Sequence, residues 1–377
     1  MSWTGQAKLR RQTIGSVVNK QGKGNPQVFD VPNIGYLSDV EISTILSFQL
    51  GTAPASAADA FAPYSGGMDR VTLYVNSIGN LIDVSGEMLA VITAIDDHYR
   101  YGSAVVQGAP SKFISAATAA TSATTDEWHH RIPLGLQLNN LPWPIGLFQT
   151  ALQNLSVRAQ IRQLPLLATT GTPGTGLYVP AGTTTVTSDE AGQNQLLEKY
   201  FDPIGDQASQ PYLGFLHRWT QWQVPLTKSG DLQILLPGQN YYLRLLLWIV
   251  SGASGALAPD GTNLQRLRLM YGANLAPIDE DETKHETSDR MRRQYGNLYP
   301  TLPTGLYSLD FVHETHDNRD WINAAGTTNL RVVPTLSPSG TYTGGGYINI
   351  AVEEVAPLLL PAGAVVQGSA PMVTAGQ

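Results

Sequence analysis

The sequence that decides the fold is Leu306-Tyr307-Ser308-Leu309-Asp310-Phe311-Val312. We expect Leu306, Leu309 and Phe311 to be buried and the residues between them to be half-exposed, as in a strand that enters a β-sandwich. The segment 299–305, which is rich in proline and glycine, precedes it and favours a turn. The stretch is therefore predicted to be a β-strand that starts directly after a turn.

The segments on both sides of this strand complete the pattern. Residues 283–295 are charged and are expected to form a helix, whereas residues 329–333 and 347–355 are expected to form strands. Polar or glycine-rich loops connect them at residues 316–321 and 344–346, and no βαβ pattern is present. The strands are therefore predicted to be antiparallel.

The chain before this region shows the same kind of pattern. Strands are expected at residues 40–48, 68–75, 130–136, 156–164, 183–187, 212–224 and 241–250. Residues 84–95 carry apolar side chains three to four positions apart and are predicted to form a short amphipathic helix. Another short helix is expected at residues 196–200, as a link between two halves of the chain.

The two halves repeat in outline. Arg70-Val71-Thr72-Leu73 is echoed by Arg266-Leu267-Arg268-Leu269, and a helix-like segment follows each of them. Further on, strand-like segments within residues 132–161 correspond to strand-like segments within residues 306–333. The same order of elements predicts an all-β fold of two tandem jelly-roll β-barrels, a double jelly roll with short flanking helices.

This duplication divides the chain into five parts. They are a basic N-terminal arm (residues 1–25), a first jelly roll (26–195), a linker (196–211), a second jelly roll (212–357) and a C-terminal tail (358–377). A chain of 377 residues is long enough to bury two full cores.

The composition agrees with this fold and excludes some functions. Charged residues make up only 14% of the chain, which suits an all-β protein whose surface is covered by neighbouring subunits. The net charge of −7 argues against a coat that binds nucleic acid across its surface, because such binding relies on lysine and arginine. The chain has no cysteine, which excludes disulfides and cysteine-ligated metals.

The start of the chain is basic. Its lysines and arginines precede the first acidic residue, Asp30, and are Lys8, Arg10, Arg11, Lys20 and Lys23. Two interpretations stay open: a disordered terminus, or an arm that lies on anionic lipid headgroups or on a neighbouring subunit. No apolar run of signal-peptide length is present there, so we expect no cleaved export signal. The most apolar run, 241–250, contains Arg244 and is too short for a membrane span, so it is predicted to be a buried strand.

Four features in this order carry a resemblance to a known family. They are the charged helix with the pair Arg292-Arg293, the strand Leu306-Tyr307-Ser308-Leu309-Asp310, the loop Asp317-Asn318-Arg319-Asp320 and the strand Asn329-Leu330-Arg331-Val332. This order resembles the second barrel of the major capsid proteins of tectiviruses. Those are double jelly-roll proteins of tailless phages that enclose a lipid membrane.

The resemblance implies a structural capsid protein rather than an enzyme. It implies homotrimers that form pseudo-hexagonal capsomers of an icosahedral shell around an internal membrane, in a virion whose protein is made in the host cytoplasm. The partners would be neighbouring capsomers, vertex (penton) and minor capsid proteins, and the internal membrane with its proteins. Because that membrane separates the shell from the genome, no direct binding of nucleic acid is expected, and the basic arm would face the interior.

Five residues are predicted to stabilise a loop or a subunit contact. Asp289 has the helical spacing for salt bridges with Arg292 and Arg293, either within the helix or between subunits. Asp317 and Arg319 offer bidentate pairing and backbone caps in an irregular loop.

Metal and catalytic sites are not expected. His313 and His316 could share an ion with nearby carboxylates, but on a continuing strand they would lie on opposite faces, so we interpret the segment as a polar loop. The acidic run 279–282 lacks the glycine and the spacing of a calcium loop and is typical of a helix N-terminus. No nucleophile elbow, phosphate-binding loop or dinucleotide fingerprint is present, so no cofactor is expected.

A carbohydrate-binding double β-sandwich is the alternative function. It would use aromatic side chains of the second half as a stacking platform, namely Trp219, Trp222, Tyr241, Tyr242 and Trp248. Aromatic residues on sandwich strands more commonly pack in the core, so we favour a core role for them.

Overall fold

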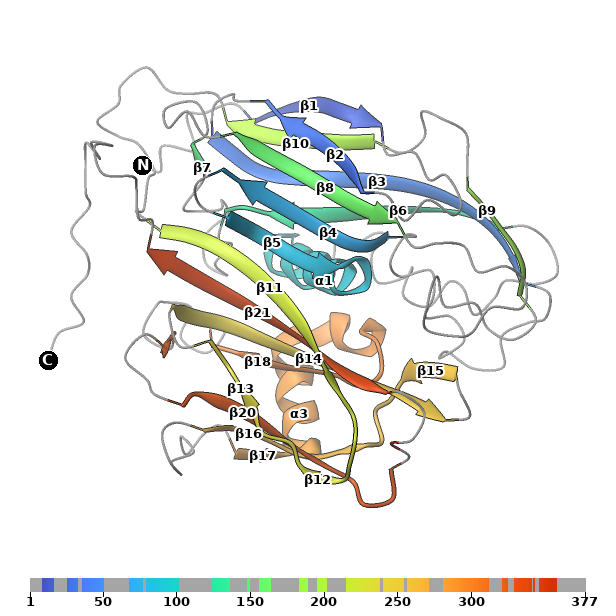
Figure 1. Ribbon diagram of the computed structural model, residues 1–377, viewed down its shortest axis with the longest axis vertical. Helices are drawn as coiled ribbons and strands as arrows, with labels where there is room; N and C mark the ends of the chain where they lie inside the picture. The colour runs from blue at the N-terminus through green and yellow to red at the C-terminus, as the bar shows by residue number, and fades with distance from the viewer. Residues whose placement is uncertain are drawn as a thin grey trace, which may run out of the picture.

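The computed structural model shows a β-rich molecule in two halves (Figure 1). It describes residues 9–16, 26–32, 36–50, 68–76, 79–101, 124–135, 148–149, 156–163, 183–188, 195–201, 215–237, 240–253, 256–270, 281–311, 321–324, 329–340, 342 and 346–357.

The first half is a jelly roll of two sheets. Its main strands are β1 (Leu9–Ser16), β2 (Gln27–Val31), β3 (Tyr36–Leu50), β4 (Met68–Val75), β5 (Gly79–Ser85), β6 (Thr124–Pro133), β8 (Val157–Gln163) and β10 (Gln195–Phe201). One sheet has the order β1-β10-β3-β6, and the other has the order β5-β4-β8-β2. Two shorter strands, β7 (Phe148–Gln149) and β9 (Thr183–Ser188), pair with β3. The helix α1 (Gly86–Tyr101) directly follows β5.

The second half is built in the same way. Its strands are β11 (Phe215–Pro225), β12 (Gly230–Asp231), β13 (Ile234–Leu235), β14 (Tyr241–Ala253), β15 (Ala256–Pro259), β16 (Leu264–Met270), β17 (Asp281–Thr283), β18 (Leu306–Asp310), β19 (Ile322–Asn323), β20 (Arg331–Leu336) and β21 (Tyr347–Pro357). One sheet contains β15-β14-β21-β11, with β18 and β19 also paired to β14, and the other contains β12-β20-β16-β17, with β13 paired to β20. The helix α3 (Lys284–Tyr295) follows β17 and continues as the 3-10 helix η7 (Gly296–Thr301).

The order of strands confirms the duplication. The sheet order β1-β10-β3-β6 in the first half matches β11-β21-β14-β18 in the second, and β2-β8-β4-β5 matches β12-β20-β16-β17. The two segments that echo each other in the sequence, 70–73 and 266–269, lie on the equivalent strands β4 and β16. In both halves a helix follows the last strand of the second sheet: α1 follows β5, and α3 follows β17. The predicted fold class, a double jelly roll with short helices, is confirmed.

One sheet runs from one half into the other. β5 of the first jelly roll pairs with β11 of the second, through Trp219 opposite Ile82 and Thr220 opposite Asp83, and this pairing is parallel. The expectation that all strands are antiparallel is therefore wrong at this one pair among the described strands. The pair joins two strands that belong to different barrels, so no hairpin constrains their relative direction.

Residues 196–200 form a strand, so the predicted helix there is wrong. The segment lies within β10, which pairs with β1 on one side and with β3 on the other. Because two neighbouring strands satisfy its backbone groups, sheet pairing overrides any local tendency to form a helix. The predicted arm (1–25) and linker (196–211) thus each contain a strand of the first jelly roll.

α1 is buried on almost every side rather than on one face. Met88, Leu89, Val91 and Ile92 are all 0% exposed. The helix lies between the two halves in Figure 1, so the first jelly roll covers one side and the second covers the other. It has a capped start, because the Ser85 hydroxyl accepts a hydrogen bond from the Met88 amide at 3.2 Å.

The deciding strand β18 is likewise more buried than predicted. All five of its residues are buried, including the three expected to be half-exposed, Tyr307, Ser308 and Asp310. The reason is that β18 pairs with β14 in its sheet while α3 covers it, with the Tyr295 and Ser308 hydroxyl oxygens 2.6 Å apart.

Candidate functional site: a buried ionic network between the two halves

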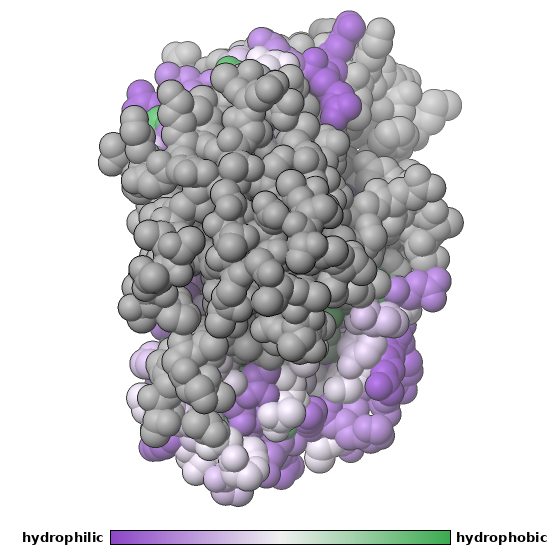
Figure 2. All heavy atoms as spheres, turned by 90° about the vertical axis from the view of Figure 1, so that its right-hand side faces the viewer, coloured by the Kyte–Doolittle hydropathy of each residue, from purple (hydrophilic) through white to green (hydrophobic). Residues whose placement is uncertain are grey.

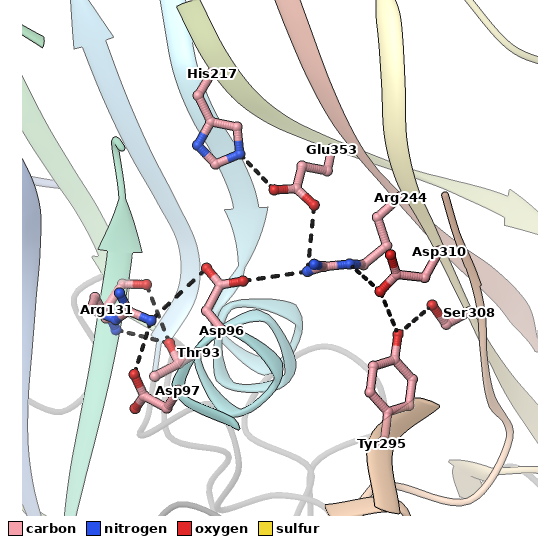
Figure 3. A network of polar contacts seen from close by, with 10 residues as sticks. All are labelled: Thr93, Asp96, Asp97, Arg131, His217, Arg244, Tyr295, Ser308, Asp310 and Glu353. Carbon is pink, nitrogen blue, oxygen red and sulfur yellow. Dashed lines mark hydrogen bonds and ion pairs between the residues drawn. The ribbon is translucent and has the colours of Figure 1, made fainter. Parts of the chain in front are cut away.

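Arg244 is the centre of a buried polar network (Figure 3). Its side chain is 2% exposed, although it lies on the apolar strand β14. Its Nε donates to Asp310 Oδ2 at 3.0 Å, and its Nη1 lies 3.3 Å from Asp96 Oδ1 and 3.4 Å from Glu353 Oε2. Asp310 and Glu353 are its register partners on β18 and β21, whereas Asp96 comes from α1 of the first half. One guanidinium therefore connects the two jelly rolls.

A bulge in β14 helps to place this arginine. The register between β14 and β21 shifts between Tyr242 and Arg244, which leaves Leu243 without a register partner on β21. Such a bulge re-aims the side chains that follow it. All three of these residues are buried. The irregularity thus occurs directly before the residue that has to reach across to α1.

β11 supplies the histidine side of the network. His217 Nε2 lies 2.7 Å from Glu353 Oε1, and the two side chains are 1% and 4% exposed. Trp219, two residues further along the strand, places its ring centre 5.8 Å from the Arg244 guanidinium carbon. That distance allows a cation–π interaction, which adds to the ion pairs of Arg244.

α1 is connected to its own half by a matching set of contacts. The Thr93 hydroxyl donates to the Arg131 carbonyl at 3.2 Å and accepts from the Arg131 amide at 2.9 Å. The Arg131 side chain lies 2.9 Å from Asp97 and 4.0 Å from Asp96. Because Arg131 is on β6, these bonds fix the end of α1 against the first jelly roll. Asp96 thus lies between an arginine of each half.

The second helix joins the network through Tyr295. Its hydroxyl contacts Ser308 and donates to Asp310 Oδ2 at 3.3 Å. Burial raises the pKa of Tyr295, with the charge of Asp310 as a second cause, so the phenol stays neutral and remains a donor. Asp310 therefore receives hydrogen bonds from both Arg244 and Tyr295.

The electrostatics of the network are dominated by its carboxylates. Asp96, Asp310 and Glu353 are buried together with two guanidinium groups, those of Arg244 and Arg131. Burial raises the pKa of Asp96, while the two arginines act in the opposite direction. The arrangement can fix two packed domains relative to each other.

The predicted basic residues are placed only in part. Arg10 and Arg11 lie exposed on β1, and Arg11 Nη2 is 2.7 Å from Glu41 Oε2 on β3. This part of the arm is thus a strand of the first jelly roll, not a disordered terminus. Lys8, Lys20 and Lys23 lie outside the described residues.

The predicted structural residues of α3 are on its surface. Arg292 Nη1 donates to Asp289 Oδ1 at 3.1 Å, and its guanidinium lies 5.4 Å from the ring centre of Tyr299. The intrahelical alternative therefore holds for this pair. Arg293 is exposed. Asp317 and Arg319 lie outside the described residues.

The metal-ligand candidates are described only in part. His313 and His316 lie outside the described residues, and within those residues no group of three or more potential ligands surrounds one point. In the acidic run, the two carboxylate oxygens of Glu282 accept hydrogen bonds from Arg290 at 2.7 Å and 2.8 Å. The carboxylate of Asp281 accepts a hydrogen bond from Arg266 at 2.6 Å.

The aromatic side chains lie mainly in the core. Trp219, Tyr242 and Trp248 are 0% exposed, which confirms the favoured core role for them. Trp222 is half-buried and Tyr241 is 42% exposed. The two buried tryptophans cannot take part in a stacking platform at the surface.

None of the charged residues of the central network is among the functional candidates predicted from the sequence. The signal that could have found it is an arginine inside a strand that is otherwise apolar, because such a residue needs a buried partner. Among the described helices, none is long and apolar enough to cross a membrane.

Comparison with known proteins identifies the architecture. No protein-family model and no curated protein sequence matches the chain. Among solved structures, the PBCV-1 virus capsid superposes with a TM-score of 0.58 at 12% identity, over 93% of this chain and 94% of that one. The STIV major capsid protein gives 0.57 at 11% identity, over 93% and 97%. The Faustovirus major capsid protein gives 0.50 at 12% identity, over 94% and 91%. The resemblance expected from the sequence thus holds at the level of the fold, and the chain has the double jelly-roll fold of viral major capsid proteins.

Proposed function

We propose that this protein is the major capsid protein of a tailless, membrane-containing icosahedral virus similar to the tectiviruses. The observation that carries the proposal is that nearly the whole chain superposes on nearly the whole of two viral capsid proteins. The fold alone does not define a function, so the proposal also rests on the surface and on the joint between the barrels.

The joint between the two jelly rolls suits a rigid building block. A shared sheet, through β5 and β11, and the Arg244 network hold two barrels of the same topology side by side. Three such chains around a threefold axis would present six similar barrels, which is a pseudo-hexagonal tile. A homotrimeric capsomer is therefore the assembly that we propose.

The described surface favours a structural role over a ligand-binding one. On the face shown in Figure 2, the described residues of the lower half are mostly hydrophilic. Within the described residues, the ion pair Arg266–Asp281 joins the neighbouring strands β16 and β17, and Arg268–Asp231 joins β16 to β12 across β20. The carbohydrate-binding alternative loses its main support because Trp219 and Trp248 are buried.

The proposed partners follow from this assignment. They are further copies of the chain, neighbouring capsomers, vertex and minor capsid proteins, and the internal membrane, within a virion assembled from protein made in the host cytoplasm. The basic residues Lys8, Arg10, Arg11, Lys20 and Lys23 would face that membrane or an adjoining capsomer. No direct contact with nucleic acid is proposed, in keeping with the net charge of −7.

The oligomeric state is the direct test. Size-exclusion chromatography with light scattering should give a mass close to that of three 40.6 kDa chains, and electron microscopy should show near-hexagonal particles. Monomeric jelly-roll proteins of similar size, run on the same column, provide the control. A stable monomer at micromolar concentration would overturn the capsomer assignment.

A further inference from the structure

An arginine–aspartate pair at the edge of the first jelly roll is repeated at the edge of the second. Arg70 of β4 pairs with Asp83 of β5, and Arg266 of β16 pairs with Asp281 of β17. The arginine Nε lies 2.6 Å from the aspartate Oδ1 in the first half and 2.5 Å in the second. Because β4 is equivalent to β16 and β5 to β17, the duplication has kept this edge in both halves.

In the first half, this edge is used to join the two jelly rolls. Arg70 Nη2 donates to the carbonyl oxygen of Gln221 on β11 at 3.1 Å. The Gln221 side-chain oxygen accepts a hydrogen bond from the Ser85 amide at 2.6 Å. Beside these contacts β5 and β11 pair in parallel, with Asp83 opposite Thr220. The edge of the first jelly roll therefore binds the first strand of the second.

In the second half, the same edge is open among the described strands. β17 ends its sheet and pairs only with β16, and the Arg266 side chain is 48% exposed. β1 is the counterpart of β11, and it ends its own sheet and pairs only with β10. Figure 1 shows β1 at the top of the molecule and β17 at the bottom, so they cannot pair within one chain. Open strand edges present backbone groups that can pair with another chain.

A bulge that both halves share fixes which residues of β1 and β11 correspond. Ser38 of β3 is skipped in the register with β10, and Leu243 of β14 is skipped in the register with β21. The Ser38 carbonyl accepts from the amide of Leu134, directly after β6, at 3.1 Å. The Leu243 carbonyl accepts from the amide of Phe311, directly after β18, at 2.9 Å. The two bulges are therefore equivalent positions.

Counted from these bulges, Gln12 of β1 corresponds to Thr220 of β11, and Thr13 corresponds to Gln221. In the joint, Thr220 is the residue that lies opposite the aspartate of β5, and the Gln221 carbonyl receives the hydrogen bond of the arginine. On β1 the two counterparts, Gln12 and Thr13, are both exposed. The groups that make the joint on β11 are thus accessible on β1.

We propose that the edges of β17 and β1 are the two sides of one interface between copies of this chain. β17 of one copy pairs in parallel with β1 of the next, with Gln12 opposite Asp281 and the Arg266 guanidinium donating to the Thr13 carbonyl. The two surfaces differ, so the contact repeats from copy to copy and can close into a ring. The inference rests on the proposed function, because closure with three copies is the proposed capsomer. Since it uses the backbone of β1, the pairing does not require the basic side chains of that strand.

The exposed face of α3 adds a second layer to this interface. α1 lies between the two halves in Figure 1, whereas α3 packs on β18 of its own half. The side chains of Asp289 and Arg292 are 43% and 61% exposed, and Arg293 is exposed as well. In the proposed interface α3 takes the place of α1 and turns this face toward the first jelly roll of the next copy. A face that is in water before assembly has to be polar, in agreement with its charged residues.

Engineered disulfides test the register, because the chain has no cysteine of its own. A variant with both Gln12→Cys and Asp281→Cys should form covalent dimers and trimers on mild oxidation, since paired strands bring two cysteines within bonding distance. The control combines Thr220→Cys with Asp83→Cys at the equivalent pair of the joint, and it should link only within one chain. Denaturing electrophoresis without reductant measures both. Each single-cysteine variant should form no covalent trimer.

Arg266→Ala tests the hydrogen bond across the interface. The variant loses one charge-assisted hydrogen bond per contact, so association at each interface should weaken roughly tenfold. Arg158→Ala is the matched control, because Arg158 is 57% exposed and pairs with Asp30 at 2.9 Å, but its strand β8 lies inside a sheet. Light scattering over a dilution series measures association, and the control should equal the wild type.

The outcomes separate this interface from the proposed function. Cross-links between copies, together with weaker association of Arg266→Ala, would support the interface. A three-chain mass without cross-links between copies, while the control pair links within the chain, would overturn the interface and leave the capsomer standing. Equal association of Arg266→Ala and Arg158→Ala would overturn the proposed role of Arg266. A monomeric wild type at micromolar concentration would overturn both the interface and the capsomer.

Discussion

Arg244 has carboxylate partners on three elements, and this arrangement determines what its loss would do. A buried guanidinium is costly to remove from water, and Asp96, Asp310 and Glu353 offset that cost through short contacts. Without the arginine, the same three carboxylates would stay buried while losing their shared cation. The intact network is therefore expected to add only modestly to the free energy of unfolding, whereas removal of one partner is expected to lower that free energy strongly.

We therefore expect Arg244→Ala to lower the free energy of unfolding by about 3–5 kcal/mol, as found when one partner of a buried ion pair is removed. Urea unfolding measures this change. Arg11→Ala is the matched control, because the Arg11 side chain is 60% exposed and its pair with Glu41 is expected to contribute about 1 kcal/mol or less. Equal losses in the two variants would show that the Arg244 network does not stabilise the joint.

At this scale the sequence predicts burial in part, but not partners. The run 241–250 forms the predicted buried strand even though it contains Arg244, whereas Tyr307, Ser308 and Asp310 are more buried than predicted. The Arg244 partner Asp96 is 148 positions away, and no local pattern links the two. The same holds for His217 and Glu353, which only the pairing of β11 with β21 brings together.

Elements with local start and stop signals are the ones that the sequence predicts well. α3 begins where expected because Thr283 and Glu286 form a reciprocal capping box. The predicted helix at residues 196–200 is wrong because the conformation of β10 depends on its pairing with β1 and β3 and not on its own residues. The amphipathic pattern predicts α1, but the side expected to be polar and exposed is also covered, since Thr93 and Asp97 contact Arg131 of the first jelly roll and Asp96 contacts Arg244 of the second.

The turn before β18 provides a test of element geometry. Gly305 has a φ of 79°, and a Cβ atom there would lie 2.6 Å from the Asp260 carbonyl oxygen. Gly230 has a similar φ of 87° but nothing within 4 Å of the added atom. Gly230→Ala should cost about 1 kcal/mol through backbone strain, and Gly305→Ala about 1–3 kcal/mol more through the clash. Thermal unfolding measures both, and equal losses would show that the turn tolerates the extra atom.

At the scale of the whole molecule, the duplication is readable from the sequence but the joint is not. Weak sequence matches, such as that of residues 70–73 with residues 266–269, together indicate two tandem barrels because they recur in the same order along both halves. These two segments lie on the equivalent strands β4 and β16. The parallel pairing of β5 with β11 has no such signal, since it involves only two residue pairs from different barrels. The sequence therefore does not predict how the two barrels are held together.

The basic segment is the part of the chain that we propose to face the membrane or an adjoining capsomer. Arg10 and Arg11 are exposed on β1 while their backbone is part of a sheet, and Arg11 pairs with Glu41 of β3. Deleting the segment would also remove β1 and uncover β10, so replacing the charges is the sharper experiment. Each basic residue near an anionic membrane contributes about 1 kcal/mol, and salt screens this attraction.

A variant with glutamine at positions 8, 10, 11, 20 and 23 should keep the mass of the wild-type assembly but lose binding to anionic lipid vesicles at low salt. Co-sedimentation with vesicles measures the binding, and neutral vesicles together with wild-type protein at high salt provide the controls. The expected pattern is retention of the wild type on anionic vesicles alone, because many weak contacts act together when trimers line one surface. Equal retention of the variant would exclude the membrane contact and leave a subunit contact as the role of these charges, since a subunit contact requires no lipid.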